Sequence, residues 1–183
     1  AVGNSRSLAH YLLQTTAFNY CQKRLEEADM SDTGMNMDVI RHCPLFKLLD
    51  DEQFAHIAPR LQIITLNAGE ILYSEGAPAD TVSIVIEGTL EAIKMSILGG
   101  EQTVLSEFGA YDVIGEIALL SDRKRSASIR AQTPTKLASF QRAIYGTLER
   151  QRPDIALAIM KAVAKILAER LQDTSADLAD VCA

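Results

Sequence analysis

The sequence is poor in the residues that build metal centres and disulfide frameworks. Its three cysteines (Cys21, Cys43 and Cys182) are widely spaced without a C-x-x-C pair, and its three histidines are equally scattered. Neighbouring His42 and Cys43 supply only two ligands, whereas a structural zinc site takes four. We therefore expect no metal site, and reduced, structural thiols of the kind found in cytoplasmic proteins.

The sequence also lacks a basic excess, a long apolar run and a secretion signal. Its net charge of -6 argues against nucleic-acid binding as the main task, because phosphate backbones require a basic face. No apolar run approaches the roughly 18 residues that a membrane span needs. No basic stretch followed by an apolar one opens the chain, so we expect no signal peptide. The chain starts without Met, which is consistent with a processed or excised piece of something longer.

The proportions of hydrophobic and charged residues in the sequence are typical of a globular protein. Of its 183 residues, 48% are hydrophobic and 23% are charged, and this length suits one ordinary domain with extra helices. The apolar spacing in the first third predicts an amphipathic helix over Leu8–Ala28. It further predicts a second helix capped by Asp38, and a short one over Asp51–Ile57 that follows Asp50.

From Leu61 the chain turns to short β-rich segments separated by glycine turns. A spacing of about eight to twelve residues is typical of a small antiparallel barrel or sandwich. The segments are Ile63–Leu66, Ile71–Tyr73, Thr81–Ile86, Leu90–Ile97, Thr103–Leu105 and Thr135–Phe140. Pro153 then opens a long helix with one apolar face. The sequence thus predicts an α+β fold: an antiparallel β-barrel or jelly roll with N-terminal helices and a long C-terminal helix.

The segment Gly115–Ala127 carries the residues of an anion site. Gly115 permits a backbone approach that a side chain would block, and the turn after it presents N–H groups to an anion. Arg125 offers a planar guanidinium suited to phosphate oxygens, and Ser126 adds a hydroxyl donor. Glu116 is an acceptor when ionised, and suits the hydroxyl of a sugar.

Glu116 and Arg125 together leave two interpretations open. They can form a structural ion pair in a barrel that has lost its ligand. Alternatively, a ligand that carries both an anion and a hydroxyl satisfies the two side chains separately, and a cyclic nucleotide is such a ligand.

In this segment the sequence resembles the cyclic nucleotide-binding domain family, whose phosphate-binding cassette runs roughly F-G-E-[LI]-A-L-x-x-x-x-P-R-[AS]-A-[ST]. The resemblance covers about Asp38 to Gln172 and includes barrel turns upstream. Two departures stand out: Lys124 replaces the usual proline, and Tyr111 stands where the family usually has glycine. The matching cassette residues are Gly115, Glu116, Ile117, Ala118, Leu119, Arg125, Ser126, Ala127 and Ser128.

The resemblance implies a role for each part of the cassette. Glu116 would receive the ribose 2′-hydroxyl, and Arg125 would pair with the cyclic phosphate. The remaining phosphate contacts would come from backbone N–H groups around Ile117 and Ala118, with Ser126 and Ala127. In the family, threonine after the arginine is associated with cyclic GMP, so Ser126 favours cyclic AMP, with cyclic GMP as the alternative.

The C-terminal helix would close over the base as a lid and pair with its copy in a homodimer. The stretch Arg170–Ser175 is similar to the base-contacting stretch of the catabolite-activator branch, which makes Thr174 a candidate base contact. Counted from Pro153, however, this stretch lies four residues late, about one helical turn. Leu105 matches the pocket-lining strand of the same branch. The implied divisions are an N-terminal helical extension (1–37), the cyclic nucleotide-binding barrel (38–152) and a lid or dimerisation helix (153–183).

These features predict a cytoplasmic sensory module in which a cyclic nucleotide repositions the C-terminal helix. Too few residues follow Ser175 for a DNA-reading domain, so we expect no nucleic-acid partner for the chain as given. Alternatives are a regulatory fragment of a larger channel, transporter or enzyme, and a domain that has lost its ligand. We expect no catalysis and no cofactor beyond the nucleotide, because no nucleophile–base pair, metal shell or Walker loop is present.

Overall fold

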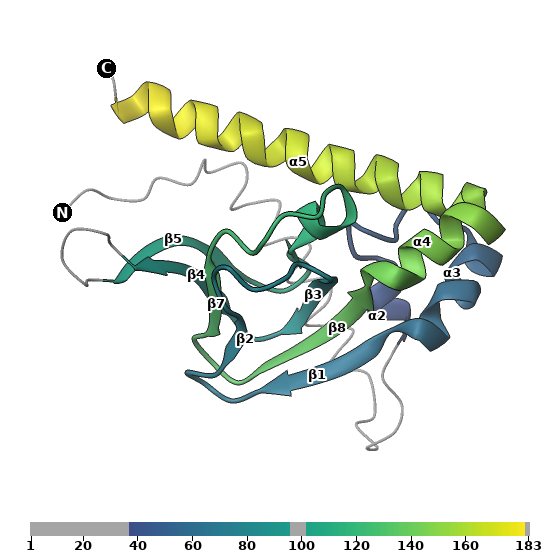
Figure 1. Ribbon diagram of the computed structural model, residues 1–183, viewed down its shortest axis with the longest axis horizontal. Coiled ribbons are helices and arrows are strands. Elements are labelled where there is room, and N and C mark those ends of the chain that lie inside the picture. Colours follow the sequence, from purple (N-terminus) through teal and green to yellow (C-terminus); the bar gives the residue numbers. More distant parts are fainter. Residues whose placement is uncertain (1–36, 96–101, 182–183) are drawn as a thin grey trace.

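The structure is a computed structural model that describes residues 37–95 and 102–181 (Figure 1). These residues form two four-stranded antiparallel sheets. One sheet has the order β1 (Gln62–Leu66), β8 (Thr135–Gln141), β3 (Thr81–Glu87) and β6 (Val113–Ile114). The other has the order β2 (Ile71–Tyr73), β7 (Ser128–Ala131), β4 (Leu90–Met95) and β5 (Gln102–Phe108).

The two sheets face each other across a small apolar core. Val85 and Leu137 enter it from the first sheet, and Leu90 and Ile129 enter it from the second. Alternate residues of a strand point to opposite faces, so the strands bury one side against the partner sheet. Pairing of β3 with β8 aligns Val82 with Phe140, whose side chains are fully buried in a second core beneath the helices.

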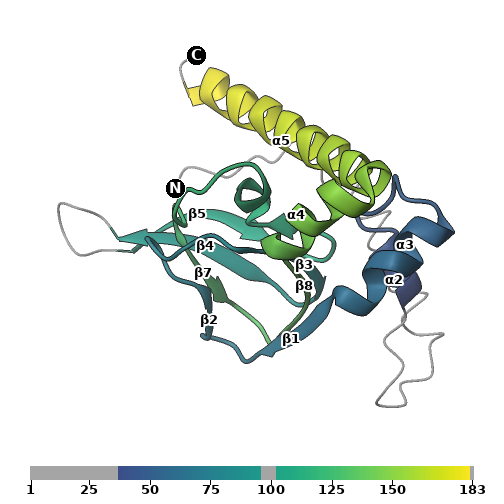
Figure 2. The same ribbon diagram turned by 45° about the vertical axis from the view of Figure 1, so that its right-hand side comes forward.

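That second core is covered by helices at one end of the molecule (Figures 1 and 2). The described helices are α2 (Met37–Arg41), α3 (Asp51–Ile57), η1 (Ala58–Arg60), η2 (Glu116–Leu119), α4 (Arg142–Gln151) and α5 (Pro153–Val181). Phe46 sits at the centre of this core, with its ring centroid 5.8 Å from Phe54 and 6.5 Å from Phe140. Helix α5 contributes Ile155 and Ile159 and then continues along one long side of the molecule.

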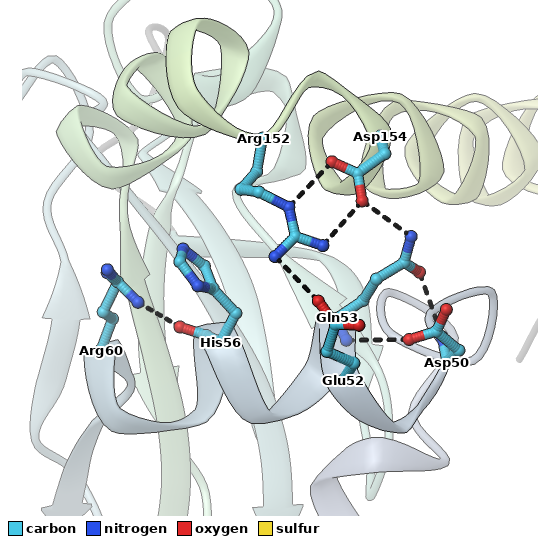
Figure 3. A network of polar contacts seen from close by, with 7 residues as sticks. All are labelled: Asp50, Glu52, Gln53, His56, Arg60, Arg152 and Asp154. Atoms are coloured by element: carbon cyan, nitrogen blue, oxygen red, sulfur yellow. Dashed lines mark hydrogen bonds and ion pairs between the residues drawn. The ribbon is translucent and has the colours of Figure 1, made fainter.

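A polar network fixes α3 to the junction of α4 and α5 (Figure 3). Arg152 separates the two helices, and its guanidinium donates to both carboxylate oxygens of Asp154, at 3.0 and 2.9 Å. Gln53 of α3 donates to the same carboxylate (3.1 Å), and its side-chain oxygen accepts from the backbone N–H of Asp50 (3.1 Å). Glu52 lies 3.4 Å from the Arg152 guanidinium. The start of α5 is therefore held by charged contacts from outside its own helix.

The predicted α+β fold, with its antiparallel sheets and long C-terminal helix, is confirmed. Asp50 caps α3 as a capping box, and Pro153 is the first residue of α5. The expectation for Asp38 was wrong, because α2 already begins at Met37 and Asp38 lies inside it. The prediction also missed β6 and β7, which are short and surround the cassette. The helix expected over Leu8–Ala28 lies outside the described residues.

No helix among the described residues is both long enough and apolar enough to cross a membrane.

Candidate functional site

Gly115 joins β6 to η2 in a conformation that excludes a side chain. Its φ angle is +78°, in the left-handed region that L-residues with a Cβ rarely adopt. A Cβ at this position would overlap Nη1 of Arg125 and would lie 3.1 Å from the Thr81 carbonyl oxygen. Gly115 therefore lets the Arg125 guanidinium lie directly against the backbone at the start of η2.

Arg125 is a buried cation that has no carboxylate partner among the described residues. Its side chain is 8% exposed, and Nη2 donates to the Thr81 carbonyl at 2.6 Å. The guanidinium carbon lies 3.5 Å from the centroid of the Tyr73 ring. Its Nε is buried with no hydrogen-bond partner. A charged group without full compensation is costly to bury, so this geometry favours an anion as the missing partner.

Glu116, the first residue of η2, is paired with α5 instead of with Arg125. The residue is 3% exposed, and Oε1 accepts from Nη1 of Arg170 at 2.6 Å. The other nitrogen of Arg170, Nη2, donates to the Val113 carbonyl. Oε2 of Glu116 is buried without a hydrogen-bond partner. The alternative of a Glu116–Arg125 ion pair is therefore not the arrangement found, and one carboxylate oxygen remains available as an acceptor.

The other predicted site residues divide between buried and exposed positions. Ala118 and Ala127 are 2% and 8% exposed and lie in the apolar cores. The Ala118 N–H, predicted as a phosphate donor, donates to the Gly115 carbonyl at 3.0 Å. Ile117 and Ser126 are exposed on the surface of the cassette. The structure thus places buried Arg125 against Gly115, which is next to buried Glu116, while Ile117 and Ser126 are exposed.

Leu105 and Thr174 lie outside the cassette segment, on β5 and α5. Leu105 is 54% exposed on the edge strand of its sheet. Thr174 is exposed, and its hydroxyl donates to the carbonyl of Arg170, one turn earlier in α5. Among the described residues, neither side chain forms a hydrogen bond or ion pair with Arg125 or Glu116, so the roles of Leu105 and Thr174 stay predictions.

The two departures from the family pattern are accommodated by the backbone. Tyr111 has a φ of +72°, which is the glycine-like conformation expected at that turn, and its N–H donates to the Val85 carbonyl (2.7 Å). The carboxylate of Asp112 accepts from the N–H of Gly109 at 2.8 Å, which closes the same turn. Lys124 forms a backbone bridge with Pro78. The turn is therefore closed by hydrogen bonds with Tyr111 in it, and the loop is joined to Pro78 through Lys124.

Two residues that contact the site were missed by the sequence reasoning. Arg170 opens the stretch Arg170–Ser175, in which the sequence predicts a contact only for Thr174, so a signal near Arg170 was present. Tyr73 gave no signal beyond its place in a β-segment. Burial is the largest influence on the Tyr73 hydroxyl and raises its pKa above the ordinary value. The Tyr73 ring is therefore neutral in the physiological pH range.

Comparison with known proteins agrees with this geometry. Residues 63–149 match the family described as "Cyclic nucleotide-binding domain". The chain is 33% identical to the N-terminal domain of a transcriptional regulator from Streptomyces coelicolor A3(2), over 72% of this chain and 94% of that one, with a TM-score of 0.63. It is 27% identical to the catabolite activator protein of Thermus thermophilus, over 76% and 63% of the two chains, with a TM-score of 0.63. The chain belongs to the cyclic nucleotide-binding domain family through residues 63–149, which run from β1 through the two sheets to helix α4.

Another relative is a much longer protein, and this chain matches only a small part of it. The chain is 33% identical over 118 residues to the lysophospholipase NTE1 of Phaeosphaeria nodorum. The match covers 64% of this chain but spans only 8% of that relative's length. The similarity therefore concerns a small part of the lysophospholipase.

Proposed function

We propose that this chain binds cyclic AMP in the cassette Gly115–Ala127 and transmits the binding event through α5. The observation that carries the proposal is the buried Arg125 guanidinium, whose Nε has no partner and which pairs with no carboxylate of the described residues. A cyclic phosphate supplies one negative charge and several acceptor oxygens to that cation. Membership of the cyclic nucleotide-binding family supports the same ligand class.

The phosphate end of the ligand is assigned to Arg125 and its neighbours. Arg125 donates from its Nε, which is buried and has no hydrogen-bond partner, and exposed Ser126 adds its hydroxyl. Backbone N–H groups around Ile117, Ala118 and Ala127 complete the set. Because the Ala118 N–H already donates to Gly115, a phosphate oxygen must share this hydrogen or shift η2 slightly.

The sugar end of the ligand is assigned to Glu116. Its free Oε2 accepts the ribose 2′-hydroxyl, while Oε1 is held by Arg170 of α5. A hydrogen bond between a carboxylate and a hydroxyl contributes about 1.5–3 kcal/mol. The sugar therefore binds at a carboxylate that is already connected to the C-terminal helix.

Arg170 provides the physical link between the ligand and α5. A ligand can shift the helix only if it contacts the two helix positions differently. The hydroxyl and Arg170 compete for the charge of one carboxylate, so binding changes the strength of the helix contact. Thr174 lies one turn beyond Arg170 and is the proposed base contact once α5 has moved, with Leu105 lining the pocket opposite. Leu171 is 69% exposed and suits the proposed homodimer contact between two α5 helices.

The proposal for cyclic AMP over cyclic GMP rests on Ser126, which stands where threonine is associated with cyclic GMP. The whole protein in which this domain acts is proposed to be cytoplasmic. A regulatory unit of a larger enzyme is the alternative, which the similarity to a small part of a lysophospholipase supports.

Isothermal titration calorimetry with cyclic AMP and cyclic GMP tests this function. We expect micromolar-range binding of cyclic AMP that Arg125→Ala abolishes. Arg123→Ala is the matched control, since it removes an exposed cation two residues away and leaves the buried one in place. Absence of binding heat with both nucleotides would contradict the proposal. Binding of cyclic GMP that is tighter by tenfold or more would show that Ser126 does not select cyclic AMP.

A further inference from the structure

Arg125 is held in place without an opposite charge. Most buried arginines pair with a carboxylate, which accepts hydrogen bonds from the guanidinium and compensates its positive charge. Here the guanidinium has three neighbours: the Thr81 carbonyl at 2.6 Å, the Tyr73 ring at 3.5 Å and the bare backbone of Gly115. Thr81 supplies one hydrogen bond, and Gly115 supplies space. The planar face of the cation is therefore supported by Tyr73.

Tyr73 is itself fixed by hydrogen bonds inside the barrel. Its hydroxyl lies 2.7 Å from Oγ of Ser83, which in turn lies 2.7 Å from Oγ of Ser139. Ser83 and Ser139 are 0% and 2% exposed. The Tyr73 hydroxyl also lies 3.3 Å from the Thr81 carbonyl that accepts from Arg125. The ring therefore has little freedom to tilt, and the guanidinium that stacks on it has a defined orientation.

An aromatic ring holds a cation in a way that suits an anion receptor. A carboxylate in the same position would orient Arg125 but would also compete with an incoming phosphate and cancel its charge. The ring attracts the cation through its quadrupole and carries no net charge. Burial keeps the Tyr73 hydroxyl neutral, so the ring gains no negative charge in the physiological pH range. Arg125 consequently keeps its full positive charge for the ligand.

We infer that Tyr73 is a positioning residue for phosphate recognition, which holds the Arg125 guanidinium against Gly115 as an uncompensated cation. This inference rests on the proposed function, because the anion that Arg125 awaits is the cyclic phosphate. Tyr73 acts through Arg125 and needs no contact with the nucleotide.

Calorimetry on two Tyr73 variants separates the ring from its hydroxyl. Tyr73→Leu removes the aromatic face, and we expect cyclic AMP affinity to fall about tenfold, which corresponds to about 1.4 kcal/mol. Tyr73→Phe keeps the face, and we expect affinity to stay within about threefold of the original chain, since the hydroxyl forms its hydrogen bonds with Ser83 and the Thr81 carbonyl. Ile71→Leu on the same strand is the control, because Ile71 is 46% exposed.

A spectroscopic measurement tests the stack without ligand and without relying on full stability of the variants. Protons above an aromatic face are shielded, so the Arg125 Nε–H should appear upfield in a proton–nitrogen NMR spectrum, assigned by its loss in Arg125→Lys. We expect Tyr73→Phe to keep this shift and Tyr73→Leu to abolish it. An unshifted Nε–H in the original chain, or unchanged affinity in Tyr73→Leu, overturns the inference. If the original chain binds neither nucleotide, the proposed function fails, and the NMR shift alone decides whether Tyr73 positions Arg125.

Discussion

Replacing Gly115 with alanine should weaken nucleotide binding more than it weakens the fold. The substitution has two separable costs, one in the backbone and one at Arg125. The backbone cost arises because φ is +78°, a conformation that costs an L-residue roughly 1–2 kcal/mol. For a chain of this size, that loss lowers the melting temperature by about 2–8 °C.

The second cost of Gly115→Ala falls on the ligand contact. The new methyl group would overlap Nη1 of Arg125, which is the end of a flexible side chain and can move, whereas the Thr81 carbonyl at 3.1 Å is backbone. Arg125 would therefore leave its position between Gly115 and Tyr73. Loss of one charge-assisted hydrogen bond costs about 1.5–3 kcal/mol, so cyclic AMP affinity should fall by about 10- to 100-fold.

Gly69→Ala provides the matched control for this experiment. Gly69 has a φ of +88°, and a Cβ there meets nothing within 4 Å, so the variant carries the backbone cost alone. Thermal denaturation should show similar losses for the two variants, and calorimetry should show weakened binding only for Gly115→Ala. Equal cyclic AMP affinity in Gly115→Ala and Gly69→Ala would refute the reasoning that Arg125 must lie against Gly115 to bind.

Two further predictions concern Glu116, which contacts α5, and Asp154, which lies in the first turn of α5. Glu116→Gln should weaken cyclic AMP binding about tenfold, because a neutral amide is a poorer acceptor for the ribose hydroxyl; calorimetry at neutral pH checks this, and unchanged affinity would contradict the assignment of Glu116. Asp154 should make stability fall in acid, because the hydrogen bonds from Arg152 hold its pKa below the ordinary value. Because this pKa is lowered in the folded chain, the ionised carboxylate stabilises the fold above the unfolded-state pKa of about 4. The stabilisation is lost as the pH falls from about 4 towards the lowered pKa. Asp154→Asn should therefore flatten the fall of melting temperature below about pH 4, and an identical pH profile in the variant would count against the network at the α4–α5 junction.

Local features of the sequence predicted those parts of the fold that depend on neighbouring residues. Asp50 was read as the residue before α3, and its capping box is a contact within four residues. Pro153 was read as the start of α5 because a proline at the first helical position needs no N–H donor. The strands β6 and β7 were missed because two- and four-residue segments carry almost no periodicity.

The interactions of the cassette could not be predicted in the same way. The pairing expected as an alternative, Glu116 with Arg125, was reasonable for two charges close in sequence. The structure pairs Glu116 with Arg170, which is 54 residues away on a helix whose register the sequence left uncertain by one turn. That register depends on how α5 packs from Ile155 onward, and no local pattern specifies it.

The sequence alone predicts the cassette Gly115–Ala127, because its glycine, carboxylate and arginine suit a ligand with an anion and a hydroxyl, and because the segment resembles the cassette of the cyclic nucleotide-binding domain family. Only the tertiary structure decided how each charge is partnered. It placed Arg125 over the Tyr73 ring, left the Arg125 Nε without a hydrogen-bond partner, and connected Glu116 to α5. The physical reason is that a side chain's type is local, whereas its partners come from strands and helices that meet only when the chain has folded.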